Sequence, residues 1–247
     1  MKRAIVIGAT SGIGKEVALL LAKQGWIVGA AGRRENKLLE LQQEIPSVHI
    51  KSLDVTSADA PFKINELISE MGGMDLFFLS SGIGKQNAAL DETIELQTLE
   101  TNGVGFTRVI TAAYRYFRKQ GNGHIAAISS IAGTKGIGTA PSYSATKKFQ
   151  NTYLQALAQL AYLEKIPIQI TDIRPGFVDT ALLDEGHYYP MKMKPQKVAC
   201  SIVKAVNHRR RIKIIDHRYA LLVFFWRLFP RCVWEKPRYF LRKLFGF

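Results

Sequence analysis

Strand-like and helix-like stretches alternate along most of this chain, and the alternation limits the folds open to it. Short apolar runs such as Ala4–Ile7 and residues 76–79 are separated by longer segments whose apolar residues recur every three or four positions. A strand that is apolar throughout is typical of a parallel sheet covered on both faces. The pattern therefore predicts one α/β domain, a doubly wound parallel sheet with helices on both faces.

The expected elements can be placed along the sequence. Strands are predicted at 4–7, 26–31, 48–53, 75–79, 124–129, 166–173 and 212–215. Helices are predicted directly after the first strand and at 35–44, 58–71, 90–119, 141–164 and 195–206. Ligands of such sheets bind beyond the carboxyl ends of the strands. Six short motifs follow strand ends, beginning at Gly8, Arg33, Asp54, Ser80, Ser130 and Pro175.

The loop after the first strand combines glycines with hydroxyl side chains. Gly8, Gly12 and Gly14 permit close backbone approach, and the amides at the following helix start favour an anionic group such as a pyrophosphate. Their spacing, GxxxGxG, differs from the commoner GxGxxG fingerprint, and a turn without a ligand is the alternative. The cofactor contacts predicted in this loop are Gly8, Thr10, Ser11, Gly12, Ile13 and Gly14.

The second and third strands end in charged residues. Folds that bind NAD tend to place an acidic residue after the second strand, whereas this chain has Arg33 and Arg34. Guanidinium groups suit bidentate contact with a phosphate, so we expect NADP(H) to be favoured over NAD(H); a solvated basic turn is the alternative. Asp54 and Val55 are expected near the adenine, although Asp54 is equally suited to capping the next turn.

A serine, a tyrosine and a lysine follow the fifth strand. If a helix begins at residues 141–142, Tyr143 and Lys147 share one face, because residues four apart on a helix are neighbours. We expect the lysine charge to lower the pKa of the tyrosine from about 10 toward the range that general acid-base chemistry needs. The YxxxK spacing alone also fits a solvated face, so its position beside the other strand ends carries the prediction.

The long helical stretch 90–119 contains Asn102-Gly103, a pair that opposes helix formation. Such local conflicts are often functional. A bend at Gly103 would leave Asn102 free to bind a water molecule. Alternatively, Gly103 and Gly105 only permit close packing of the helix.

Together these motifs resemble the classical short-chain dehydrogenase/reductase family over about residues 1–210. The resemblance implies a Rossmann core and a catalytic tetrad. In it Asn102 holds a relay water, Ser130 orients the substrate carbonyl, Tyr143 is the acid/base and Lys147 is its partner. Ser130 is preferred to Ser129 because it precedes Tyr143 by the thirteen residues usual in the family.

The resemblance also implies where the cofactor lies. It places Gly8, Gly12 and Gly14 at the pyrophosphate, Arg33 near the adenosine phosphate and Asp54 near the adenine. The remaining cofactor contacts it suggests are Ser81, Gly82, Tyr143, Lys147, Pro175, Gly176, Val178 and Thr180. A homodimer or homotetramer is implied in the same way.

The chain departs from the family pattern at two places near the cofactor. Ile7 stands where a threonine is usual, and Ser80-Ser81-Gly82 replaces Asn-Ala-Gly. Both departures change structural hydrogen bonds beside the cofactor and leave the tetrad intact.

Charge and cysteine content indicate the cellular location expected for the protein. The chain has 34 Lys and Arg against 20 Asp and Glu, a net charge of +14, and residues 181–247 hold 15 against 4. The two cysteines, Cys200 and Cys232, are too few for a disulfide scaffold. With no predicted secretory signal and no apolar run long enough to span a bilayer, we expect a cytoplasmic protein. His208 and His217 are expected to be surface groups, and no metal site is predicted.

Residues 219–247 interleave large apolar side chains with arginines and lysines. Such a segment is typical of a helix that lies on an anionic membrane; packing on its own domain or on a second subunit are the alternatives. No nucleic-acid partner is expected, because no recognised binding module is present. We therefore expect a catalytic domain at 1–218, with a substrate loop at about 181–197, and an extension at 219–247.

These observations predict an oxidoreductase that transfers hydride between a nicotinamide cofactor and a carbonyl or secondary alcohol substrate, which the apolar tail suggests is lipophilic. The alternative is a catalytically silent nucleotide-binding or membrane-surface scaffold protein of the same fold. The complete tetrad favours the enzyme.

Overall fold

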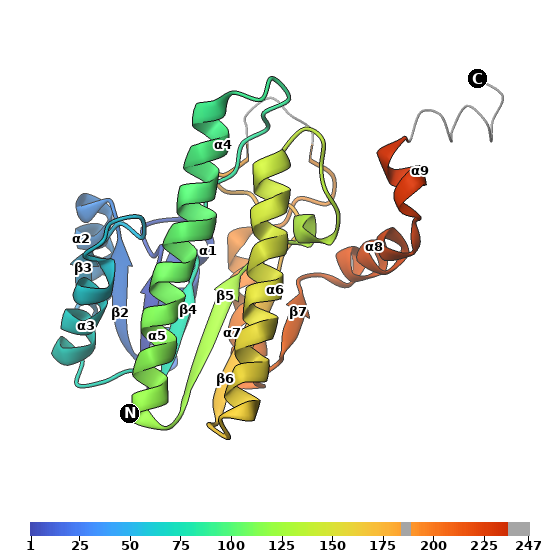
Figure 1. Cartoon of the computed structure of the whole chain (residues 1–247). Helices are drawn as coiled ribbons and strands as arrows, with labels where there is room; N and C mark the ends of the chain where they lie inside the picture. The colour runs from blue at the N-terminus through green and yellow to red at the C-terminus, as the bar shows by residue number, and fades with distance from the viewer. Residues whose placement is uncertain (184–188, 237–247) are drawn as a thin grey trace.

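The computed structural model describes residues 1–183 and 189–236, and these form one α/β domain with a C-terminal helical arm (Figure 1). The sheet of the described residues has the order β3-β2-β1-β4-β5-β6-β7, and every neighbouring pair is parallel. The doubly wound parallel sheet predicted from the sequence is confirmed. Its strands are β1 (Arg3–Ile7), β2 (Ile27–Gly32), β3 (His49–Ser52), β4 (Leu76–Leu79), β5 (Gly123–Ile128), β6 (Ile168–Arg174) and β7 (Ile212–Ile214).

Helices cover both faces of this sheet. Along β1, Val6 packs with Val17 of α1, whereas Ile7 packs on the opposite face with Ile64 of α3 and Val109 of α5. This alternation is the two-residue period of a strand buried on both sides. The helices that flank the sheet are α1 (Gly12–Lys23), α2 (Glu35–Glu44), α3 (Ala60–Glu70), α5 (Phe106–Gln120), α6 (Pro141–Leu163) and α7 (Pro195–Asn207).

The single helix expected at 90–119 is three consecutive segments. They are α4 (Glu92–Leu99), the π-helical turn η1 (Glu100–Gly105) and α5. The irregularity therefore falls at Asn102-Gly103, where the sequence conflicts with regular helix, and π-turns of this kind are frequent at functional sites. A Cβ on Gly105 would lie 2.9 Å from Val55, so close packing explains this glycine, whereas a Cβ on Gly103 would meet no atom within 4 Å.

The C-terminal arm consists of α8 (His217–Leu228) and α9 (Arg231–Glu235), beyond β7 in Figure 1. The helix begins two residues before the expected extension, and its Tyr219 and Val223 are buried in the core shared with α1 and α7. The start of the tail is thus part of the packed domain. The segment predicted as a substrate loop, about 181–197, overlaps the start of α7, which Pro195 opens.

No helix among residues 1–183 and 189–236 is long and apolar enough to cross a membrane.

Tyr219 joins the arm to the segment after β6. Its hydroxyl lies 2.9 Å from the Pro190 carbonyl oxygen and accepts a hydrogen bond from the Phe177 amide at 3.2 Å. We expect Tyr219→Phe to lower the free energy of unfolding by about 1–2 kcal/mol, because it leaves the Phe177 amide and the Pro190 carbonyl, both in part-buried hydrogen bonds, without this partner. Urea denaturation measures the change. Tyr162→Phe, on an exposed tyrosine, is the control; equal stability of the two variants would contradict the role of the hydroxyl.

Candidate active site

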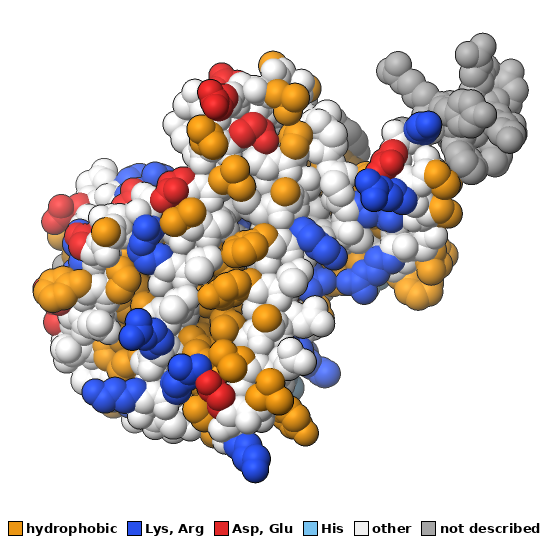
Figure 2. Space-filling view, viewed as in Figure 1, with side chains coloured by type: hydrophobic (Ala, Val, Ile, Leu, Met, Phe, Trp, Pro, Cys, Tyr) orange, Lys and Arg blue, Asp and Glu red, His pale blue; other side chains and the backbone are white. Residues whose placement is uncertain are grey.

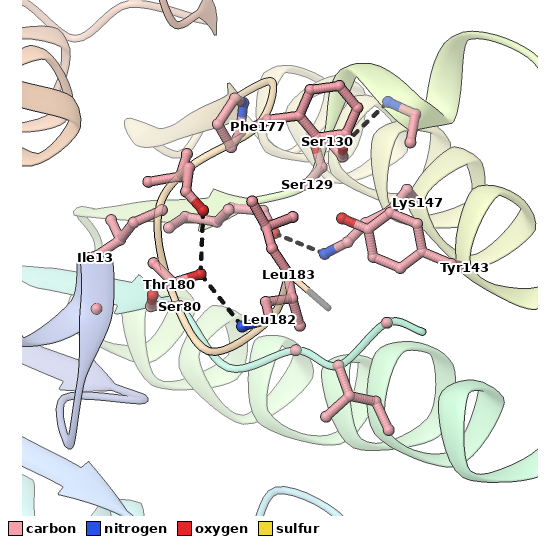
Figure 3. A pocket seen from close by; sticks show the side chains of 18 of the residues that line it. Ile13, Ser80, Ser129, Ser130, Tyr143, Lys147, Phe177, Thr180, Leu182 and Leu183 are labelled. Carbon is pink, nitrogen blue, oxygen red and sulfur yellow. Dashed lines mark hydrogen bonds between the residues drawn. The ribbon is translucent and has the colours of Figure 1, made fainter. Parts of the chain in front are cut away.

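A cavity of about 670 Å³ lies at the carboxyl ends of the strands. The loops after β1, β2, β3, β4, β5 and β6 all contribute to its wall, as the predicted strand-end motifs require. Figure 3 shows Tyr143 and Lys147 together on one side and Leu182 and Leu183 across from them. The cavity therefore brings together motifs that are far apart in the sequence.

The glycine loop forms one end of the cavity wall. Gly8 has a φ of +88°, and a Cβ there would lie 2.7 Å from the Ser81 amide nitrogen, so only glycine fits this turn beside the β4 loop. Gly14, also predicted as a cofactor contact, does not line the cavity. A Cβ on Gly14 would lie only 2.1 Å from the Gly8 carbonyl oxygen, so its role is to let α1 approach the loop. The other predicted contacts in this loop that line the cavity are Gly8, Thr10, Ser11, Gly12 and Ile13.

Arg33 and Arg34 line the same end. The Nη2 atom of Arg34 donates to the Thr10 hydroxyl at 2.8 Å and to the Ser11 hydroxyl at 2.6 Å. The side chain is thereby held against the glycine loop, where an anionic group would meet both the guanidinium and the free amides of α1. These residues fit a phosphorylated dinucleotide.

Asp54 takes the capping role that the sequence left open. Its Oδ1 atom accepts from the amide of Thr56 at 3.0 Å and from the Thr56 hydroxyl at 2.9 Å. Asp54 and Val55 also line the cavity, so this capped turn lies where the adenine is expected. Ser81 and Gly82 line it from the loop after β4. The departure at Ile7 is accommodated by burial, because that side chain lies in the core.

Ser130, Tyr143 and Lys147 meet as the sequence predicts. Ser130 caps a short 3-10 turn, η2 (Ile131–Thr134), by accepting from the Ala132 amide at 3.0 Å, and its hydroxyl lies near enough to Tyr143 to affect the pKa of that phenol. The Lys147 Nζ atom lies 5.7 Å from the centre of the Tyr143 ring. All three side chains line the cavity.

The expected lowering of the Tyr143 pKa is not what the structure shows. Burial raises the pKa of Tyr143 above its ordinary value, and the hydrogen bond from Ser130 acts in the opposite direction as the smaller effect. The buried phenolate loses its hydration, and this loss is the dominant effect on the pKa.

Burial also acts on Lys147, lowering its pKa to about 8, and the carboxylate of Asp172 opposes this shift. The ammonium donates to the Ile128 carbonyl oxygen at 3.3 Å and to the Gln150 Oε1 atom at 3.0 Å. Two of its three N–H groups are thus directed to fixed acceptors. This holds the cation in place beside Tyr143.

Gln150 is the site residue that the sequence reasoning missed. Its Oε1 accepts from Lys147, and its Nε2 donates to the Asn102 backbone carbonyl at 2.9 Å. One buried carboxamide therefore joins the lysine to the π-turn. The available signal was its spacing, since residues 143, 147 and 150 share one face of a helix.

The prediction that Asn102 is free to bind water is wrong for its side chain. The carboxamide accepts from the Ile83 amide at 2.9 Å and donates to the Ile83 carbonyl oxygen at 2.7 Å, and it also donates to Thr146. Asn102 is fully buried and does not line the cavity. It clamps the loop after β4 to the π-turn instead.

Ser129 also lines the cavity, but its hydroxyl is part of a buried network. Its hydroxyl donates to the Asp172 carboxylate and accepts from the Asn151 amide at 2.7 Å. Arg174 forms an ion pair with the same carboxylate at 2.6 Å. The two adjacent serines thus differ in their partners, which supports the choice of Ser130 as the one directed at a substrate.

The remaining wall comes from the segment after β6 and from the arm. Of the predicted substrate loop, Leu182 and Leu183 line the cavity on one side of residues 184–188, and Tyr189 and Met191 on the other. His187 and Tyr188 of this predicted loop lie outside the described residues. The predicted cofactor contacts that line this part are Pro175, Gly176, Val178 and Thr180.

The chain matches the family model of the short chain dehydrogenases over residues 2–187. It belongs to the short-chain dehydrogenase family. An uncharacterized oxidoreductase of Myxococcus xanthus (strain DK1622) is 35% identical to this dehydrogenase over 194 residues, 76% of each chain. An uncharacterized oxidoreductase of Staphylococcus aureus (strain USA300) is 31% identical over 224 residues, which cover 86% of this chain and 94% of that relative.

The same fold is found in a solved structure, that of a variant of actinorhodin polyketide ketoreductase with NADPH. It aligns with a TM-score of 0.77 at 24% identity and covers 87% of this chain and 95% of that one. The family match and these relatives together show an oxidoreductase of the short-chain dehydrogenase family. Within residues 1–183 and 189–236, no three His, Cys, Asp or Glu side chains come together as metal ligands would.

The buried lysine makes stability depend on pH in a specific direction. Between the folded pKa of about 8 and the ordinary 10.5, the unfolded chain carries a proton on Lys147 that the folded chain does not. The free energy of unfolding should therefore rise with pH through this interval, by up to about 1.4 kcal/mol per pH unit from this group. Lys147→Met should lack this rise. Denaturation of both proteins across the interval measures the difference, and parallel pH profiles would contradict it.

Proposed function

We propose that this short-chain dehydrogenase is an NADP(H)-dependent oxidoreductase acting on a carbonyl or secondary alcohol group. The observation that carries the proposal is the convergence of Ser130, Tyr143 and Lys147 in the cavity that the glycine loop also lines. A phosphate-binding end and an acid-base end in one cavity fit a dinucleotide with its substrate beside it.

The residues divide the chemistry of carbonyl reduction between them. The nicotinamide, when bound, supplies the hydride for the carbonyl carbon. Tyr143 donates its hydroxyl proton to the carbonyl oxygen, and Ser130 stabilises the negative charge that develops there by hydrogen bonding. The ammonium of Lys147 stabilises the phenolate that remains on Tyr143 until solvent returns a proton. The reverse sequence oxidises an alcohol.

In this proposal Gln150 and Asn102 are positioning residues. Gln150 fixes Lys147 through its carboxamide, and Asn102 fixes the loop after β4. In this proposal the return of a proton to Tyr143 does not depend on a water held by the Asn102 side chain, because that side chain is hydrogen-bonded to Ile83 and Thr146.

The proposed substrate is lipophilic. Apolar side chains also line the cavity, including Leu182, Met191 and Trp226. They offer a carbonyl compound an apolar wall.

Replacement of the acid tests the mechanism. Tyr143→Phe should lower kcat by about 10²- to 10⁴-fold, the usual contribution of general acid-base catalysis, with NADPH binding preserved. Loss of NADPH absorbance with a panel of ketones and aldehydes measures turnover, and fluorescence titration measures binding. Tyr153→Phe, on the same helix and outside the cavity wall, is the control. Undiminished activity in Tyr143→Phe would refute the assignment.

The arginines test the preference for NADP(H). The double variant Arg33→Ala/Arg34→Ala should bind NADP⁺ about tenfold to a hundredfold more weakly, because it loses charge-assisted hydrogen bonds to the 2′-phosphate. Its affinity for NAD⁺ should change little, since NAD⁺ has no such group. Lys37→Ala removes a nearby charge of α2 that is paired with Glu40 and serves as the control. Equal weakening of both nucleotides would overturn the preference.

The alternative function is a nucleotide-binding or membrane-surface scaffold without catalysis. It predicts NADPH binding with no oxidation of NADPH by any compound of the panel. The homodimer or homotetramer and the cytoplasmic location stay predictions of the sequence.

A further inference from the structure

The first helix of the arm is apolar on two opposite sides. Tyr219 and Val223, only 1% and 2% exposed, face the domain, and Trp226 lies half-buried on the same side. This side completes the core that also contains residues of α1 and α7. This side of the helix therefore fits one alternative given by the sequence, an arm that packs on its own domain.

The opposite side carries four large exposed residues. Leu221, Phe224, Phe225 and Leu228 are 60%, 59%, 53% and 64% exposed among the described residues. Their spacing of three and four places them in one stripe, since each residue turns an α-helix by about 100°. We call these four residues the outer face. A helix with two apolar sides is normally buried on both, so the outer face has the character of a docking surface.

The arm is held against the body of the domain, so that the outer face has a defined orientation. The indole nitrogen of Trp234 donates to the Gly136 carbonyl oxygen at 2.6 Å, and Lys135 donates to the Phe229 carbonyl oxygen at 2.8 Å. The rings of Trp226 and Trp234 lie 5.1 Å apart, which joins α9 to α8.

Positive charge surrounds the outer face. Residues 216–236 contain four exposed basic residues, Arg218, Arg227, Arg231 and Lys236, against two acidic residues, Asp216 and Glu235, which pair with Arg218 and Arg231. At about 100° per residue, Arg218 and Arg227 fall on the two flanks between the buried side and the outer face. Figure 2 shows hydrophobic side chains along the edge of the arm with Lys and Arg side chains beside them.

Charge selects the occupant of this surface. A second copy of this chain docking through the same arm would bring like charges together, which disfavours association. Anionic lipid headgroups would meet the flanking arginines while the outer face enters the apolar region below them.

We propose that the outer face of the arm docks the protein on an anionic lipid surface. The helix lies in the interface, with Leu221, Phe224, Phe225 and Leu228 toward the lipid and Tyr219 and Val223 toward the domain. The protein is then a peripheral membrane protein with its sheet outside the bilayer.

The same helix connects the lipid surface to the cavity. Leu222 and Trp226 of α8 line the same cavity as Tyr143. Resting on the proposed function, this arrangement indicates a carbonyl or alcohol substrate that is dissolved in the lipid and reaches the cavity along α8.

Vesicle binding tests the docking without any requirement for turnover. The full chain should co-sediment with vesicles of phosphatidylcholine and phosphatidylserine, more weakly with phosphatidylcholine alone, and less at high salt. Phe224→Glu/Phe225→Glu should lower the bound fraction about tenfold or more. Phe62→Glu, on the exposed surface of α3, should leave it unchanged. Tyr143→Phe should bind vesicles like the unchanged protein.

Three results would overturn the proposal. The first is absence of sedimentation by the unchanged protein, and the second is full binding by Phe224→Glu/Phe225→Glu, which would assign the binding to another part of the chain. The third is an oligomer, seen by light scattering, that the double variant dissociates while vesicles bind neither protein; the outer face would then belong to a second copy. Thermal unfolding and NADPH titration check that the double variant is folded.

A kinetic comparison tests the substrate route separately. Phosphatidylserine vesicles should raise kcat/KM for a ketone that partitions into lipid, and Phe224→Glu/Phe225→Glu should abolish that rise. A water-soluble ketone should be reduced equally by both proteins. Failure to reduce any ketone would reject the proposed function and leave the docking result standing, whereas reduction of both ketones without a vesicle effect would reject the route.

Discussion

The parallel alignment of all the strands is the constraint on which the rest of the structure depends. Because each connection returns the chain to the same edge of the sheet, every strand from β1 to β6 ends beside the same cavity. Loops separated by up to about 170 residues thereby become neighbours. The strands are buried on both faces and are therefore apolar throughout. Polar side chains are accordingly found at the strand ends.

The proposed reaction centre contains a cation, Lys147, that the fold keeps out of water. Lys147 is almost fully buried, and burial lowers its pKa to about 8. The Ile128 carbonyl, the Gln150 carboxamide and the more distant charge of Asp172 offset part of the lost hydration. Tyr143, raised in pKa by the same burial, is suited to donate a proton, since its hydroxyl stays protonated at neutral pH.

The arm packs on the domain and also contributes to the cavity wall. Tyr219 anchors α8 to the segment after β6, and the neighbouring residues of the helix either line the cavity or face outward. One short helix therefore carries three surfaces: a core contact, part of the cavity wall and the outer face. Because apolar residues occupy all three surfaces, the helix sequence shows little contrast between a polar and an apolar side.

The element order, the glycine loop, the strand-end motifs and the pairing of Tyr143 with Lys147 could all be predicted from the sequence. These depend on local properties, namely side-chain periodicity, turn residues and spacing along a helix, which neighbouring residues reveal. The place of the irregularity at Asn102-Gly103 was visible for the same reason.

The contacts of those residues could be seen only in the folded structure. The bridge from Lys147 through Gln150 to Asn102, the clamp of Asn102 on Ile83 and the packing role of Gly14 each join segments that the sequence keeps apart. The direction of the Tyr143 pKa depends on burial, and the exposed side of α8 depends on where the domain covers it. Contacts and burial are properties of the folded chain as a whole, so no local pattern contains them.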